Sequence, residues 1–237
     1  GDAGLTVAAW VRPDTFEFTN TEPLGGDPQC QYVQWLGKGE YQDRDHEWTF
    51  RIYRDDATAC SGSPSDRSKR ISFYVFAPEG GRGCGSYFQD DVQPQSWVHV
   101  VGVVDPSTQT VAIYKNGAPR HSASYAALAL MPGQAPLRLA TRDAVNRAGT
   151  AYSFFAGGLA QLQIWNLPLS KDQIDALYNS GAVPAGLVAQ YSLDEGSGNA
   201  VSDSVGGHPD GTVFGGMWDF GAYPLDMSPP GRSGGGC

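Results

Sequence analysis

The chain has 237 residues, and 25 acidic against 16 basic side chains give it a formal net charge of −9 at pH 7. No basic stripe runs along it, which argues against nucleic-acid binding, and no apolar run approaches the ~20 residues of a membrane span. Glycine (31) and proline (16) are abundant while charged residues make up only 17%, a composition typical of short strands joined by turns.

Predicted strands follow one another from the N-terminus, with turn residues between them. They cover residues 5–11, 31–37, 47–54, 70–77, 96–105, 109–117, 136–142 and 158–166. The segment "SWVHVVGVVD" is apolar on both faces, as expected of a central strand, and the dipeptide Asn116-Gly117 predicts a type I′ hairpin turn. We therefore expect an all-β fold, an antiparallel jelly-roll β-sandwich.

One short helix is predicted after the strand that ends at Trp165. Ser170 is a good N-cap, and Ile174, Leu177 and Tyr178 recur at helical spacing. The glycine of "NSG" then ends the helix. We expect about ten residues of helix packed against the sandwich.

The four cysteines predict one disulfide. The predicted strands 31–37 and 47–54 form an antiparallel hairpin. Cys30 then lies at the same end of the sheet as the loop 55–69, which contains Cys60. A Cys30–Cys60 bridge closing a loop of roughly 30 residues would contribute on the order of 3 kcal/mol. Cys84 is then left for Cys237, for another chain or as a free thiol. The tail that ends in Cys237 has a flexible composition, and an extracellular setting suits the disulfide.

Three segments carry a resemblance to a known family. "GLTVAAWVRP" and "SWVHVVGVVDPSTQTVAIYKNGAP" resemble strands of laminin-G-like domains in the concanavalin A-like lectin/glucanase superfamily. "FAGGLAQLQIWNLPLSKDQIDALYNSG" is similar to the most specific signature of that family. The matching residues are Phe155, Gly157, Trp165, Asn166, Leu169, Ser170, Ile174, Leu177 and Tyr178. The resemblance implies the same jelly-roll sandwich.

The order of the segments is unusual for this family. "GLVAQYSLDEGSGNAVSDSVGGHPDGTV" resembles the segment with which such domains normally begin, yet it comes last. Residues 186–226 either complete their own sandwich in a permuted order, start a repeat in a tandem array, or complete a neighbouring molecule by strand exchange. Because so few residues cannot bury a core alone, permutation is favoured. It gives one domain over 1–226 and a flexible tail over 227–237.

Asp43, Asp45 and Glu47 are the candidate catalytic residues. The superfamily includes glucanases that use acids at every second position of one strand, so that all face one cleft. The spacing here agrees, but the run lies in a predicted hairpin tip, and a solvated tip does not raise the pKa of a catalytic acid. We therefore expect no enzyme, with a polysaccharide-cleaving activity as the last alternative.

Calcium is a possible cofactor, because the resemblance implies a site of carboxylate and carbonyl oxygens. Ala160 and Gln161 stand where the family usually has an acidic pair, which weakens this expectation. The remaining candidate ligands are Asp194, Asp203 and Asp210. The alternative for these three is an Asp/Gly turn in which the side chains accept backbone N–H groups.

The candidate ligand-binding residues are Tyr87, Asp90, Asp91 and Trp48. The first three lie in the long polar loop 78–95, and loops of a sandwich usually carry its function. The resemblance implies an extracellular, non-catalytic module that binds glycans or matrix proteins. The alternative is a structural subunit of an extracellular filament or array that self-assembles through sandwich contacts or strand exchange.

Overall fold

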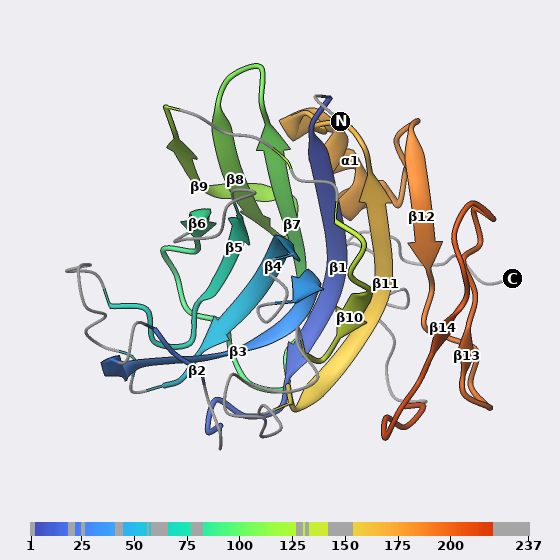
Figure 1. The fold of residues 1–237 in the computed structure, drawn as a ribbon, viewed down its shortest axis with the longest axis horizontal. Helices are drawn as coiled ribbons and strands as arrows, with labels where there is room; N and C mark the ends of the chain where they lie inside the picture. Colours follow the sequence, from blue (N-terminus) through green and yellow to red (C-terminus); the bar gives the residue numbers. More distant parts are fainter. Residues whose placement is uncertain are drawn as a thin grey trace, which may run out of the picture.

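The computed structural model describes residues 3–18, 22–24, 27–40, 45–55, 57, 66–76, 83–126, 130, 133–141 and 154–219. Backbone alone is described for 22–24, 27–30 and 40. In this part of the chain the strands form two facing antiparallel sheets and a small two-stranded one (Figure 1). The predicted jelly-roll sandwich is confirmed.

The first sheet has the order β12-β11-β1-β7-β8-β9. Its strands are β1 (Leu5–Pro13), β7 (Val98–Asp105), β8 (Thr110–Lys115), β9 (Ala118–Ser124), β11 (Gly157–Trp165) and β12 (Leu187–Tyr191). β7 lies between β1 and β8 and is buried over seven of its eight residues, as its apolar sequence predicts. The turn between β8 and β9 has positive φ at Asn116 (52°) and Gly117 (76°), which confirms the predicted type I′ turn.

The second sheet has the order β10-β3-β4-β5-β6, with β2 also paired to β3. Its strands are β2 (Glu22–Leu24), β3 (Asp27–Glu40), β4 (Asp45–Tyr53), β5 (Ile71–Val75), β6 (Cys84–Tyr87) and β10 (Leu137–Leu139). Figure 1 shows its blue-to-teal strands in front of the first sheet. β6 lies within a stretch expected to be a loop, and it forms because β5 offers a free edge to pair with.

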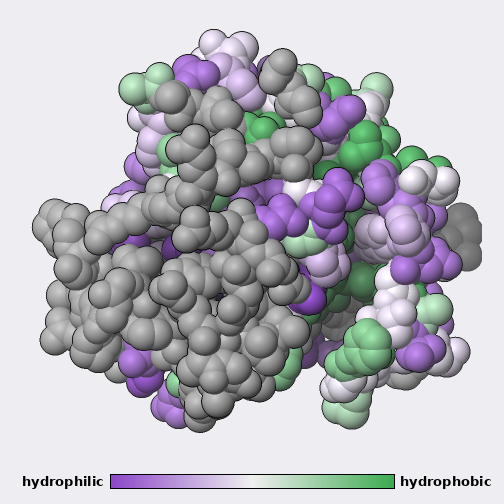
Figure 2. All heavy atoms as spheres, viewed as in Figure 1, coloured by the Kyte–Doolittle hydropathy of each residue, from purple (hydrophilic) through white to green (hydrophobic). Residues whose placement is uncertain are grey.

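The main core lies between the two sheets. Val7, Val100 and Val104 of the first sheet face Phe50 and Phe73 of the second. Gly102 lets these layers approach, because a Cβ at this position would lie 2.5 Å from the Phe73 ring. The surface in the same view is mixed, with hydrophilic side chains gathered in the middle and hydrophobic ones toward the upper right (Figure 2).

A second core lies under the helix α1 (Lys171–Ser180), on the outer face of the first sheet. Ile174 and Leu177 of α1 pack there against Val101 and Trp165. Ser170 and Gln173 form a complete capping box, which confirms the predicted start of the helix. Within the described residues, no helix is long and apolar enough to cross a membrane.

The late segment of the chain lies against its own sandwich. β12 pairs antiparallel with β11 at the edge of the first sheet, and Ala189, Tyr191 and Val201 belong to the main core. β13 (Ala200–Val201) and β14 (Gly211–Thr212) form the small sheet at the right of Figure 1. In the permuted arrangement, β12 is expected to complete the sandwich of its own chain, and its pairing with β11 agrees with that expectation.

Several predictions fall outside the described residues. The domain limit at 226 and the tail 227–237 lie there, as do Cys60, Cys237 and the side chain of Cys30. The predicted Cys30–Cys60 bridge therefore stays a prediction. Cys84, within the described residues, has a free thiol whose pKa is raised by burial.

Candidate functional site

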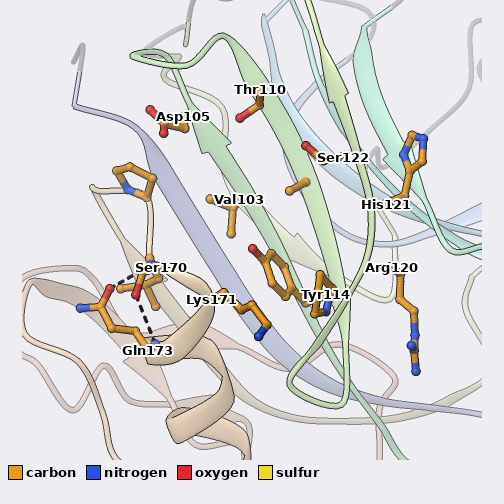
Figure 3. A pocket seen from close by; sticks show the side chains of 14 residues that line it. Val103, Asp105, Thr110, Tyr114, Arg120, His121, Ser122, Ser170, Lys171 and Gln173 are labelled. Carbon is orange, nitrogen blue, oxygen red and sulfur yellow. Dashed lines mark hydrogen bonds between the residues drawn. The ribbon is translucent and has the colours of Figure 1, made fainter.

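An open groove of about 540 Å³ lies on the outer face of the first sheet, beside the beginning of α1 (Figure 3). The helix has only ten residues, and its buried side chains pack over β1, β7 and β11. The outer side of β8 and β9 therefore stays partly open beside it. The volume falls within the range of roughly 300–1,000 Å³ that is usual for small-ligand sites.

The floor of the groove is apolar, with one aromatic ring. Val103 of β7, Ala112 of β8 and Leu169 contribute the aliphatic part. Tyr114 of β8 is half-buried, and this burial raises the pKa of its hydroxyl. A ring fixed on a strand, with a hydroxyl at its tip, can contact both the C–H face and the hydroxyl groups of a ligand.

The walls of the groove are polar. Thr110 of β8 and Ser122 of β9 add hydroxyl groups on one side, and Lys171 and Gln173 of α1 line the other (Figure 3). The charged residues Asp105, Arg120 and His121 complete the lining. The groove thus combines an aromatic floor with convergent hydrogen-bonding groups.

Two sets of hydrogen bonds fix the helical wall. The Thr6 hydroxyl of β1 donates to the Leu167 carbonyl at 2.8 Å and accepts the Leu169 N–H at 2.9 Å. In the capping box, the Gln173 N–H donates to the Ser170 hydroxyl at 3.3 Å, and the Ser170 N–H donates to the Gln173 side-chain oxygen at 2.8 Å. The start of α1 is therefore held in place before any ligand binds, which limits the entropy cost of binding.

Asp90 and Asp91, predicted as ligand-binding residues, form ion pairs next to the groove. Lys115 Nζ lies 2.7 Å from the Asp90 carboxylate, and Arg120 Nε lies 3.4 Å from it. Lys115 Nζ also donates to the Asp91 carbonyl at 2.8 Å, and Arg70 lies 4.0 Å from the Asp91 carboxylate. Arg120 lines the groove, so the predicted acidic pair borders the site rather than forming it.

Tyr87 lies on the other side of the same border. Its ring centroid is 5.2 Å from that of His121, and the Arg67 guanidinium lies 5.1 Å from the Tyr87 ring. Ser86 Oγ lies 2.7 Å from His121 Nδ1, and burial lowers the pKa of His121. Tyr87 is half-buried by these contacts.

The prediction that Trp48, the fourth candidate, binds a ligand is wrong. Its side chain points into the main core and is 3% exposed. Its neighbour Phe50 packs against it in an edge-to-face arrangement, with centroids 6.3 Å apart. The alternation of β4 turns Trp48, Phe50 and Ile52 to the same inner face, so the indole offers no face to a ligand from solvent.

Asp45 and Glu47, predicted as weak catalytic candidates, anchor a neighbouring loop. Their carboxylates accept the three backbone N–H groups of residues 133–135 at 2.8–3.0 Å. Glu47 also pairs with the Lys38 ammonium; burial nevertheless raises the pKa of Glu47. Asp43, the third predicted acid, lies outside the described residues. These contacts give both carboxylates a structural role.

Two of the three candidate calcium ligands, Asp203 and Asp210, accept backbone N–H groups. The Asp203 carboxylate accepts four backbone N–H groups at 2.9–3.1 Å, from Gln190, Val205, Gly207 and His208. Burial alone would raise the pKa of Asp203, but these N–H groups lower it to about 2. Asp210 accepts the Asp203 N–H at 3.2 Å, and Asp194 is exposed.

Calcium requires several free oxygen ligands around one point. The Asp203 oxygens already accept four N–H groups, and among the described residues no three acidic, histidine or cysteine side chains gather as a metal site. In this arrangement Asp194, Asp203 and Asp210 do not fit a calcium ion.

The outer face of the second sheet holds a buried layer of arginine and tyrosine. The Arg51 guanidinium lies 4.4 Å from the Tyr32 ring and 4.5 Å from the Tyr74 ring. Arg67 Nη1 donates to the hydroxyl groups of Tyr53 and Tyr74 at 3.2 Å. Burial would raise the pKa of Tyr53, but the two guanidinium groups lower it. Because Arg51 is 5% exposed and Tyr53 is fully buried, this layer stabilises the sheet and is closed to a ligand.

The groove itself was missed from the sequence. Tyr114 gives a partial signal, because it faces outward on a strand of alternating apolar residues. Lys171 meets Arg120 of β9 in the groove only because α1 packs across the sheet. No local pattern marks residues that meet in this way.

A family model described as the concanavalin A-like lectin/glucanases superfamily matches residues 1–175. A comparison with curated proteins found no match. Among solved structures, a protein from Bacteroides ovatus assigned as carbohydrate binding is similar at 16% identity and a TM-score of 0.58. That similarity covers 89% of this chain and 52% of the other, so the chain spans about half the length of that protein.

Two further structures share the fold at low identity. The heptameric SAP-like pentraxin of Limulus polyphemus has a TM-score of 0.54 at 14% identity, over 89% of this chain and 83% of that one. The CBM40 of the Ruminococcus gnavus IT-sialidase, bound to α2,3-sialyllactose, has a TM-score of 0.51 at 14% identity, over 74% and 83%. At these identities the similarity establishes the fold alone.

Proposed function

The chain belongs to the concanavalin A-like lectin/glucanases superfamily, and from this premise we propose that it is a non-catalytic carbohydrate-binding module that holds a sugar in the groove beside α1. The single observation that carries the proposal is the composition of that groove. A half-buried tyrosine forms its floor, and hydroxyl, amide and charged side chains surround it. Sugars present C–H faces and many hydroxyl groups, so they suit such a lining.

The similar structures support carbohydrates as the class of ligand, but they do not identify where on this chain a carbohydrate binds. The Bacteroides ovatus protein is assigned as carbohydrate binding, and the Ruminococcus gnavus module was solved with a sialylated sugar. We extend carbohydrate binding to this chain as part of the proposal. An extracellular or cell-surface location, with glycans as partners, is part of it too, because the sugars of matrices and cell surfaces lie there.

The non-catalytic part rests on the acids that a glycosidase would need. Such an enzyme uses two carboxyl groups that flank the scissile bond. Asp45 and Glu47 instead accept the N–H groups of residues 133–135, and neither lines the groove. A sugar bound against Tyr114 therefore meets no such pair from these residues.

A glycan array followed by isothermal titration calorimetry tests the proposal. The unmodified chain should bind at least one glycan class, and Tyr114→Ala should weaken that binding by about two- to tenfold, because aromatic contacts contribute about 0.5–1.5 kcal/mol. Phe214→Ala is the matched control, since Phe214 is 89% exposed and does not line the groove. Binding that survives Tyr114→Ala unchanged would place the sugar elsewhere, and silence across the array would reject the function.

A further inference from the structure

Two cationic side chains approach the groove from opposite walls. Lys171 comes from the first turn of α1 and Arg120 from β9, and Figure 3 shows Tyr114 between them. This arrangement concerns the charge of the ligand, so it rests on the proposed function and refines it.

Both cations are available for a ligand. The Lys171 ammonium has no ion pair or hydrogen bond with any described residue. Arg120 contacts Asp90 through Nε alone, at 3.4 Å, which leaves its two Nη groups without a partner in the described part of the chain. Asp90 is itself shared with Lys115 at 2.7 Å, so it does not neutralise Arg120 fully.

The other ionisable groups of the lining cancel only part of this positive charge. The Asp105 carboxylate accepts the Ser107 N–H at 2.9 Å and the Ser107 hydroxyl at 2.6 Å. These bonds lower the pKa of Asp105, so it stays ionised at pH 7 and offsets one of the two cations. Burial lowers the pKa of His121, which keeps this ring neutral at pH 7. Lys171 and Arg120 against the one carboxylate of Asp105 leave the lining with one net positive charge, although the whole chain carries a net charge of −9.

We propose that the sugar bound in this groove is acidic, and that its anionic group is held by Arg120 and Lys171. The two Nη groups of Arg120 form a planar fork that matches the two oxygens of a carboxylate. Lys171 supplies a second, flexible charge from the opposite wall. The sugar ring then lies against Tyr114, within reach of the hydroxyl groups of Thr110 and Ser122. A uronic acid and a sulfated sugar share this anionic chemistry.

Calorimetry with three oligosaccharide probes tests the inference: a neutral hexose oligomer, a uronic acid oligomer and a sulfated oligomer. An acidic probe should bind about tenfold or more tighter than the neutral one, and rising salt should weaken it. Arg120→Gln should remove about tenfold or more of that affinity, whereas Arg120→Lys should restore part of it for a sulfate but little for a carboxylate, since it loses the fork. Lys69→Gln removes the same charge outside the groove and should change nothing.

Lys171→Gln gives a second, independent reading, since Lys171 is exposed and makes no contact on which the fold depends. Equal affinity for neutral and acidic probes, or acidic binding that ignores both Arg120→Gln and Lys171→Gln, would overturn the inference. Neutral binding that remains sensitive to Tyr114→Ala would still support the carbohydrate-binding function. Binding to none of the probes or array glycans would reject the function itself.

Discussion

Acid should destabilise this fold through one buried histidine, His99. Its side chain is 3% exposed and packs against the rings of Trp10, at 5.1 Å, and Tyr178, at 5.8 Å, which also contact each other. Within the described part of the chain, its Nδ1 has no hydrogen-bond partner. Burial alone lowers the pKa of His99 from 6.5 to about 4. A protonated ring at this position would have to be buried as an unpaired charge beneath α1.

The magnitude follows from proton linkage. In the unfolded chain His99 takes up a proton near pH 6.5, whereas in the folded chain it stays neutral down to about pH 4. Its contribution is therefore fully present above pH 6.5 and is lost as the pH falls from 6.5 to about 4. Each tenfold difference in proton affinity is worth about 1.4 kcal/mol, so the loss amounts to about 3 kcal/mol.

Urea unfolding at a series of pH values between 7 and 4 measures this loss, with His99→Phe as the comparison. The phenylalanine ring keeps the contacts with Trp10 and Tyr178 but cannot be protonated, so the variant should lose about 3 kcal/mol less across the window. Asp203, whose pKa is about 2, titrates below this window. NMR titration of the ring gives a direct reading. A His99 ring that titrates near 6.5, or a variant with the same pH dependence as the unmodified chain, would refute the reasoning.

Three further substitutions test the packing. Gly102→Ala should lower the free energy of unfolding in urea by about 1–3 kcal/mol, because the new Cβ would lie 2.5 Å from the Phe73 ring. The control Gly207→Ala has its nearest neighbour at 3.8 Å and should cost under about 0.5 kcal/mol. Equal costs for the two variants would contradict the packing. Ser170→Ala should remove about 1 kcal/mol and speed amide exchange in the first turn of α1, and unchanged exchange would exclude the capping role. Asp203→Ala should cost about 2 kcal/mol or more by thermal unfolding, because four backbone N–H groups lose their acceptor; a neutral result would show that water replaces it.

Local chemistry explains the parts of the fold that the sequence predicts well. The type I′ turn depends on two neighbouring residues, Asn116 and Gly117, that both accept positive φ. The start of α1 depends on Ser170 and Gln173, three positions apart. Because each feature is decided within a few residues, it can be read before the fold is known.

Features that depend on a distant partner were missed. β6 consists of small and polar residues, "CGSY", and it is a strand only because β5 lies beside it. Arg51 and Tyr53 look like surface residues of a half-exposed strand, yet they are buried against Tyr32 and Tyr74. The groove is of the same kind, since Tyr114 and Lys171 are far apart in the sequence.

Strand exchange would require β12 to leave its own sheet and pair with another molecule. An exchanged strand must leave the edge of its own sheet, and here that edge is tied down at more than one point. β12 pairs with β11 through four residue pairs, Tyr191 donates to the Pro209 carbonyl at 3.0 Å, and Asp219 pairs with Arg12 of β1 at 3.0 Å. Departure would break all of these and would expose Ala189 and Val201 from the main core. Assembly by strand exchange therefore requires the core to open before a partner strand can bind, whereas binding a sugar in the groove leaves the sandwich intact. The described contacts therefore hold β12 in its own sheet.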